Sequence, residues 1–197
     1  MDYSQRRKAQ SRQTEQRILQ AALELMREHG YENVSVRDIC GRAGITTGAF
    51  YHHFPSKEAL ISKGFGALDH YMETALAGRG EEPPLERLRA VVGAYADFME
   101  RESGSLTARY YLLRLADAQA GVRLDPSRYI QKVMVDCFSR AWQEGFVLEN
   151  RTPEWAARFC YIHFRGVVID WLLSGYSYSL KEKMLDDYEA FRTLFRR

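Results

Sequence analysis

The chain has 197 residues, of which 46% are hydrophobic and 27% charged, a balance typical of a folded globular protein and unlike that of a disordered one. Its formal net charge is only +2, and it shows neither a long uncharged apolar run nor a leader-like N-terminus, so we predict no membrane span and no secretory signal. The three cysteines form no CxxC pair, which argues against a disulfide scaffold or a zinc finger and favours a reduced, cytoplasmic protein.

The N-terminal end carries an excess of positive charge. Arg6, Arg7, Lys8 and Arg12 are balanced there by Asp2 alone, ahead of a nearly neutral remainder. This asymmetry favours a polyanion as the partner of that end. A short basic segment that only aids solubility is the alternative.

Apolar residues recur at steps of three and four along the whole chain, and strand-like alternation is nearly absent. Predicted N-caps precede several of the resulting helices, and two of these caps are followed by proline: Ser35, Ser56, Asp125, Thr152 and Ser179. The helices are expected, in chain order, at about 14–29, 36–43, 45–53, from 57, 85–99, 106–118, 126–145, 153–174 and 180–195. We therefore predict an all-α protein of about nine helices.

The second and third helices have the spacing of a helix-turn-helix. Between them lies Ala43-Gly44-Ile45, where Gly44 permits a tight backbone turn that a β-carbon would oppose. The third helix would then present small or hydrogen-bonding side chains and no carboxylate, which suits the phosphate-lined major groove of DNA. From spacing alone, a plain three-helix core with a polar surface is the alternative.

Residues 14–61 resemble the TetR (tetracycline-repressor-like) family. Cys40 departs from the family pattern, which usually has alanine there, and Thr47-Gly48 occupy variable recognition positions. The matching segments are Gly30-Tyr31, Val34-Ser35-Val36-Arg37-Asp38-Ile39, Ala43-Gly44-Ile45, Phe50-Tyr51-His52-His53-Phe54 and Ser56-Lys57-Glu58-Ala59-Leu60.

The resemblance implies a DNA-binding head with a basic arm at residues 1–56, and a ligand-binding and dimerisation domain at residues 57–197. It implies that Arg37 reaches a base edge or a phosphate and that the third helix faces the bases. Tyr51, His52 and Lys57 would contact phosphates, whereas His53 could equally pack against the fourth helix. The full set of expected DNA-binding residues is Arg37, Thr46, Thr47, Gly48, Tyr51, His52 and Lys57.

The resemblance also implies that the C-terminal two thirds bind a small effector. Aromatic residues gather there, and an apolar helical pocket with a few polar groups is the usual form of a ligand site, which favours an apolar or aromatic effector. Each aromatic residue could instead belong only to the core. The expected effector-binding residues are Tyr95, Phe98, Tyr110, Tyr111, Arg114, Phe138, Trp142 and His163.

The last two helices carry more large apolar residues than one packing face requires. Together with the resemblance, this predicts a homodimer formed by a four-helix bundle across a two-fold axis. The alternative is that these faces are covered within one chain. The expected interface residues are Phe159, Val167, Trp171, Met184, Tyr188, Phe191 and Phe195.

An enzyme is disfavoured because no GxSxG, P-loop, HExxH or dinucleotide-binding motif occurs. The five histidines are scattered, so we expect no metal and no cofactor. Cys160 and His163 lie one helical turn apart, but buried structural cysteines are far commoner than thiol sites. A redox role for Cys40 and a DNA-bound adaptor that binds no effector stay open. We predict a cytoplasmic transcriptional regulator, a repressor that a small molecule releases from a palindromic DNA operator.

Overall fold

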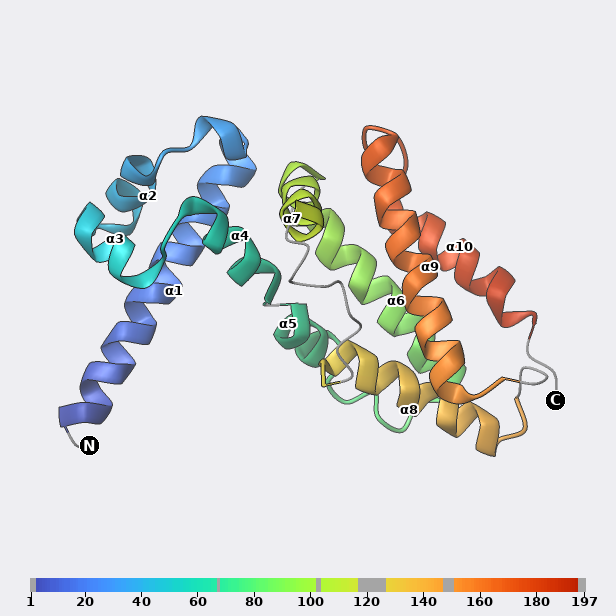
Figure 1. Ribbon diagram of the computed structural model, residues 1–197. Helices are drawn as coiled ribbons and strands as arrows, with labels where there is room; N and C mark the ends of the chain where they lie inside the picture. Colours follow the sequence, from blue (N-terminus) through green and yellow to red (C-terminus); the bar gives the residue numbers. More distant parts are fainter. Residues whose placement is uncertain (1–2, 67, 102–103, 117–126, 147–150, 195–197) are drawn as a thin grey trace. The chain divides into compact units, whose positions relative to one another are not determined.

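The computed structural model describes residues 3–66, 68–101, 104–116, 127–146 and 151–194 (Figure 1). Every regular element in these ranges is a helix, which confirms the predicted all-α class. None of the described helices is long and apolar enough to cross a membrane. The elements are α1 (Tyr3–His29), the 3₁₀ helix η1 (Tyr31–Asn33), α2 (Val36–Ala43), α3 (Thr47–His53), α4 (Lys57–Gly66), α5 (Leu68–Ala75), α6 (Pro84–Arg101), α7 (Gly104–Ala116), α8 (Tyr129–Gln143), α9 (Pro153–Leu173) and α10 (Leu180–Arg192).

The chain divides into two compact units. The first, which we call the head unit, comprises Met1–Ala67 and Ser105–Ala120. The second, the body unit, comprises Leu68–Gly104 and Gly121–Arg197. This division differs from the expected boundary at residue 56, because the head unit includes α4 and also α7.

Local signals set the ends of the helices in the head unit. Ser35 caps α2: its hydroxyl accepts a hydrogen bond from the backbone N–H of Asp38, while the Asp38 carboxylate accepts one from the N–H of Ser35. Gly44 ends α2 in the left-handed conformation, with φ of 63°, which a residue with a β-carbon adopts only with strain. Helix α1 begins at Tyr3 rather than at Thr14, because good helix formers extend the packed part of the helix without adding apolar periodicity.

The core of the head unit lies where α1 packs on α2 and α4. Ile18 and Leu25 of α1, Ile39 of α2 and Phe50 of α3 are all buried. Ile45, in the turn between α2 and α3, is half-buried. Burial of such side chains stabilises the fold by about 1.5–3 kcal/mol each. A rigid scaffold therefore holds the short helix α3 in place.

The body unit is a bundle in which α10 packs on α6, and α8 packs on both α6 and α9. Thr152 caps α9, as predicted, by accepting a hydrogen bond from the N–H of Trp155. Ser179 likewise caps α10, and its hydroxyl accepts a hydrogen bond from the N–H of Glu182. The predicted cap at Asp125 and the interface residue Phe195 lie outside the described residues.

Candidate functional site

Helices α2 and α3 form a helix-turn-helix in which the second helix is short (Figure 1). Several side chains of that second helix are exposed. Arg17 of α1 supports the turn, because its guanidinium donates a hydrogen bond to the carbonyl oxygen of Ala43, the last residue of α2. Gly44 then turns the chain, and Thr46 caps α3 by accepting a hydrogen bond of 3.2 Å from the N–H of Ala49. The position of α3 is therefore set from both sides of the turn.

The outer face of α3 carries the side chains that the sequence predicted. Thr47, Gly48, Tyr51 and His52 are exposed, as are Thr46 and Arg37 nearby, and none of them carries a negative charge. The Tyr51 side chain is 57% exposed, and its ring meets the buried Phe50 edge-on at 5.2 Å. A β-carbon on Gly48 would meet only the Thr46 hydroxyl, at 3.9 Å, so the space above this residue is open. The face is free for close approach by a ligand.

Two residues near this face have partners within the head unit. The Thr46 hydroxyl oxygen is used in the cap, although its own O–H can still donate to a phosphate. His53 is half-buried, whereas its neighbour His52 is exposed, which agrees with a packing role for His53.

Lys57, expected to contact phosphate, is held by the protein itself. Its ammonium donates hydrogen bonds to the carbonyl oxygens of Tyr31 (2.8 Å) and Val34 (2.9 Å) and lies 3.9 Å from the centre of the Tyr31 ring. Two of its three N–H donors are therefore occupied, and the side chain ties the start of α4 to η1.

The first turns of α1 form a basic arm. Arg6, Arg7, Lys8 and Arg12 are exposed, and residues 5–13 include no buried or half-buried side chain. A helical stretch that is polar on every side has no apolar face to pack against the rest of the protein, and positive charge on it suits a negatively charged partner. We call residues 3–13 the basic arm.

The expected effector-binding residues are divided between the two units. In the body unit Tyr95, Phe98 and Phe138 are buried, and their rings lie 5.9 Å from Tyr161, 5.4 Å from Tyr71 and 6.2 Å from Trp142, respectively. These contacts show aromatic packing in the core of the bundle.

The other expected effector-binding residues lie elsewhere. Tyr110, Tyr111 and Arg114 are half-buried on α7, which is part of the head unit. His163 is exposed on α9, where its Nε2 lies 3.1 Å from a carboxylate oxygen of Asp187. This contact with Asp187 links α9 to α10 at the surface of the body unit.

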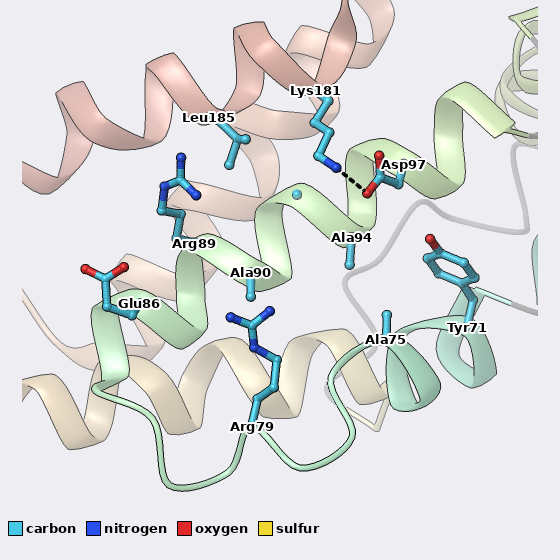
Figure 2. Close-up of a pocket in the computed structure, with 11 residues that line it drawn as sticks. Tyr71, Ala75, Arg79, Glu86, Arg89, Ala90, Ala94, Asp97, Lys181 and Leu185 are labelled. Atoms are coloured by element: carbon cyan, nitrogen blue, oxygen red, sulfur yellow. Dashed lines mark hydrogen bonds and ion pairs between the residues drawn. The ribbon is translucent and has the colours of Figure 1, made fainter.

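The body unit has a groove that sequence reasoning missed, with a volume of about 300 Å³ (Figure 2). Small residues of α6 line its centre, and Lys181 of α10 closes one side through an ion pair of 2.7 Å with Asp97. The spacing of the small residues on α6, three and four apart, was the signal in the sequence, but it is weak because such residues are common in helices. The lining residues are Tyr71, Ala75, Arg79, Glu86, Arg89, Ala90, Gly93, Ala94, Asp97, Lys181 and Leu185.

The structure corrects part of the expected dimer interface. Met184 and Tyr188 have no exposed surface, and the Tyr188 hydroxyl donates a hydrogen bond of 2.5 Å to the carbonyl oxygen of Leu85. Val167 and Trp171 are also buried. These side chains face the interior of their own bundle, so they are not available to a second chain.

A different set of apolar side chains is exposed on α9. Phe159 of the expected set belongs to it, and its ring stacks on the half-buried Phe191 at 5.8 Å. Trp155, Ile162 and Leu173 lie on the same side of α9, because steps of four, three and eleven residues return to one face of a helix. Leu173 is 83% exposed. We call Trp155, Phe159, Ile162 and Leu173 the α9 stripe.

Comparison with known sequences gives a consistent family. Residues 18–63 match the model described as bacterial regulatory proteins, tetR family. The chain is 31% identical over 144 residues to the HTH-type transcriptional repressor KstR of Mycolicibacterium smegmatis, covering 71% of this chain and 68% of that protein. It is 32% identical to KstR of Rhodococcus jostii, of which it covers 62%. The probable acrEF/envCD operon repressor of Escherichia coli is 24% identical over 90% of this chain and 84% of its own length.

Solved structures share the fold. FadR of Thermus thermophilus, a TetR family transcriptional repressor in complex with lauroyl-CoA, superposes with a TM-score of 0.66 at 20% identity, covering 91% of this chain and 93% of that one. TylP, a TetR regulator from Streptomyces fradiae, has a TM-score of 0.60 at 25% identity, covering 97% of this chain and 89% of that one.

Proposed function

This chain belongs to the tetR family of bacterial regulatory proteins and is a ligand-responsive, DNA-binding transcriptional regulator, and we propose that it acts as a homodimeric repressor on a palindromic operator. The observation that carries the proposal is the exposed face of α3, which is free of carboxylates and open above Gly48. One such face enters each of two successive major grooves. Since a homodimer is two-fold symmetric, its operator is a palindrome.

The roles of the head residues follow from their chemistry. Thr47 and Gly48 face base edges, where a threonine methyl meets a thymine methyl and a glycine lets the backbone approach closely. Tyr51 and His52 donate to phosphates, and Arg37 at the exposed start of α2 reaches a phosphate or a base edge. The positive basic arm adds attraction that does not depend on sequence.

Dimerisation is supported by the α9 stripe. Large apolar side chains exposed in a row on a helix are costly to leave in water and mark an interaction surface. A second copy of the same helix covers the stripe when two helices from each chain form a four-helix bundle. Phe191 on α10 extends this surface, because it stacks on Phe159.

An apolar or aromatic effector releases the repressor. The proposal is supported by the membership of the family, and the effector would have to enter the aromatic core that includes Tyr95, Phe98 and Phe138. The effector favours release only through contacts that it makes in one state of the protein, and a shift from 1:99 to 99:1 requires a preference of about 5.5 kcal/mol. Because the proposed target is DNA, we propose that the protein acts in the cytoplasm and as a regulator rather than as an enzyme.

Selection of binding sites from random DNA tests the proposal. The wild-type protein should enrich a palindrome, and footprinting of the selected duplex should show two protected half-sites about one helical turn apart. Gly48→Ala should fold with equal or slightly higher stability, because its methyl group meets open space and alanine favours a helix more than glycine does, but should lose most of its affinity for the selected site. Ala77→Ser, a small exposed change in the body unit, is the control. Enrichment of no motif, or full binding by Gly48→Ala, would overturn this reading of α3.

Ligand response is tested separately by thermal unfolding with a panel of aromatic and apolar compounds. Lauroyl-CoA, the ligand of the FadR structure, is a suitable first probe. A ligand that binds only the folded protein raises the midpoint, by an amount that grows with concentration. A compound that raises the midpoint and releases the selected duplex supports an effector-controlled repressor. If the protein binds the duplex but no compound in the panel raises its unfolding midpoint or releases the duplex, it would instead be a DNA-bound adaptor.

A further inference from the structure

Arg109 lies near the middle of α7. Its side chain contacts η1 and the first turn of α4, two segments of the head unit that are distant from α7 in the sequence. Its guanidinium nitrogens lie 3.8 Å from a carboxylate oxygen of Glu58 and 3.7 Å from one of Glu32. The guanidinium carbon is 4.7 Å from the centre of the Tyr31 ring. Its Nε atom is buried and makes no hydrogen bond. The Arg109 guanidinium therefore faces this cluster, with the side chain as a whole 32% exposed.

Tyr31 and Glu58 form a fixed pair beneath Arg109. The Tyr31 side chain is buried, and its hydroxyl donates a hydrogen bond of 2.5 Å to the Glu58 carboxylate. Burial, together with the neighbouring Glu58 carboxylate, raises the pKa of Tyr31 to about 12, so the hydroxyl keeps its proton at neutral pH. The same hydrogen bond is the main reason that the pKa of Glu58 is lowered, and its charge therefore persists.

These contacts join the two ends of the helix-turn-helix. Helices α2 and α3 span Val36–Ala43 and Thr47–His53. Tyr31 and Glu32 belong to η1, just before α2, and Glu58 belongs to the first turn of α4, just after α3. Arg109 is thus placed at the point where the chain enters and leaves the DNA-binding motif.

We propose that Arg109 is a positioning residue that clamps α7 to both ends of the helix-turn-helix, so that the position of α7 sets the orientation of the recognition helix α3. The proposal deepens the proposed function and rests on it. It also explains why α7, which the sequence assigned to the effector domain, belongs to the same compact unit as the DNA-binding helices.

The strength of the clamp suits regulation. Both ion pairs exceed hydrogen-bond distance, and Glu32 is largely exposed, so each contributes little alone. The cation over the Tyr31 ring adds a further modest attraction. A clamp of several weak contacts opens when α7 moves by a small distance, whereas a deeply buried ion pair would resist.

Hydrogen exchange on the full-length protein tests the clamp. Binding of a duplex that carries the site selected by the wild-type protein should slow backbone exchange in α2, α3 and α7 together. In Arg109→Met the slowing in α7 should be lost, with exchange there roughly tenfold faster than in the bound wild type, in the range typical of coupling between sites. Slowing in α2 and α3 should persist at saturating duplex. Leu112→Met, which changes a side chain on α7 that is 59% exposed, is the control and should behave as the wild type.

Three results decide between the alternatives. If duplex slows exchange in α2 and α3 of the wild type but never in α7, or if Arg109→Met and Leu112→Met behave alike, the clamp is wrong while the proposed function stands. If no duplex slows exchange in α2 and α3, the proposed function itself fails. Arg109→Lys should recover part of the slowing, because it restores the charge but not the planar group over Tyr31.

A second variant keeps the test valid if Arg109→Met unfolds. Glu58→Gln retains an oxygen that accepts from the Tyr31 hydroxyl but removes the charge opposite Arg109. If Arg109 acts through Glu58, Glu58→Gln by itself should lose the duplex-induced slowing of exchange in α7, while the slowing in α2 and α3 is retained. Wild-type slowing of exchange in α7 of Glu58→Gln would show that the two residues do not act together and would overturn the clamp.

Discussion

The ammonium of Lys57 lies 3.9 Å from the centre of the Tyr31 ring and donates a hydrogen bond of 2.8 Å to the Tyr31 carbonyl oxygen. A second hydrogen bond, to Val34, ties the first residue of α4 to the segment that leads into α2. A lysine at the edge of the DNA-binding face thus has a structural role inside the head unit, beside any role toward DNA.

Lys57→Met should lower the free energy of unfolding by about 1–3 kcal/mol, because it removes two charge-assisted hydrogen bonds to carbonyl oxygens. Urea unfolding measures this change. Lys63→Met is the control on the same helix: its partner Glu15 lies at 2.9 Å in an exposed ion pair, and its loss should cost less than about 1 kcal/mol. If Lys57 also contacts a phosphate, the salt dependence of DNA binding becomes flatter in Lys57→Met. An unchanged slope would limit Lys57 to the structural role.

Thr47→Ala should change sequence preference more than general affinity. Thr47 is exposed on the outer face of α3 and caps nothing, so its loss should leave the fold unchanged while removing about 1–3 kcal/mol of discrimination at one base pair of each half-site. Selection from random DNA with the variant measures this directly. Thr74→Ala, in the body unit, should select the wild-type motif. A variant at position 47 that also selects that motif would show that Thr47 reads no base.

Neutralising the basic arm should weaken binding to the selected site and to random DNA by similar factors. In a variant with Arg6, Arg7, Lys8 and Arg12 all changed to Gln, the slope of log K against log salt should flatten by about 0.9 for each cation that neutralises a phosphate. Fluorescence anisotropy over a salt series gives the slope. Lys132→Gln, an exposed cation on α8, should leave it as in the wild type. If the arm variant keeps the wild-type slope of log K against log salt, the arm contacts no phosphate and serves only solubility.

Ile162→Glu should yield monomers. The substitution places a charge in the middle of the α9 stripe, where Ile162 is 49% exposed and makes no part of the buried core. Analytical ultracentrifugation should show a dimer for the wild type and for Lys132→Glu, and a folded monomer with weak operator binding for Ile162→Glu. Phe191→Glu is a less selective test, because the Phe191 ring also packs against Phe138 at 6.2 Å. Dimers of Ile162→Glu would place the interface on another surface.

Acid should weaken the cap of α2. Hydrogen bonds from the Ser35 hydroxyl and backbone N–H hold the pKa of the Asp38 carboxyl below its usual range. Because this pKa is lower in the folded than in the unfolded state, the carboxylate stabilises the fold above about pH 4 and loses that contribution as pH falls through the folded pKa. Asp38→Asn should therefore reduce the fall in unfolding free energy below pH 4, whereas Asp186→Asn, on α10, should not. If the unfolding free energy falls equally below pH 4 in both variants, the Asp38 cap does not contribute to the acid sensitivity.

The helix-turn-helix was predictable because its signals are local. Ser35 and Asp38 satisfy each other's backbone groups within one turn, and Gly44 adopts the left-handed conformation that the turn needs. Ile39 and Phe50, on the inner sides of α2 and α3, are buried. Side chains within one or two helical turns of each other meet whatever the rest of the chain does.

The interface residues were harder to predict, because periodicity shows that a helix has an apolar face but not what covers it. Tyr188 and Met184 were assigned to a second chain, and the structure buries both in their own bundle. Ile162 and Leu173, which were not among the expected interface residues, are exposed. Only packing against α6 and α8 distinguished the two faces.

The sequence by itself determined the all-α class and the carboxylate-free face of α3, since capping, turn geometry and helical periodicity depend on neighbours along the chain. The tertiary structure alone decided that Lys57 and Arg109 converge on Tyr31, and that the body unit contains a groove lined by α5, α6 and α10. The pair Arg109 and Tyr31 is separated by more than seventy residues, and such contacts depend on how helices pack against one another, which no local pattern encodes.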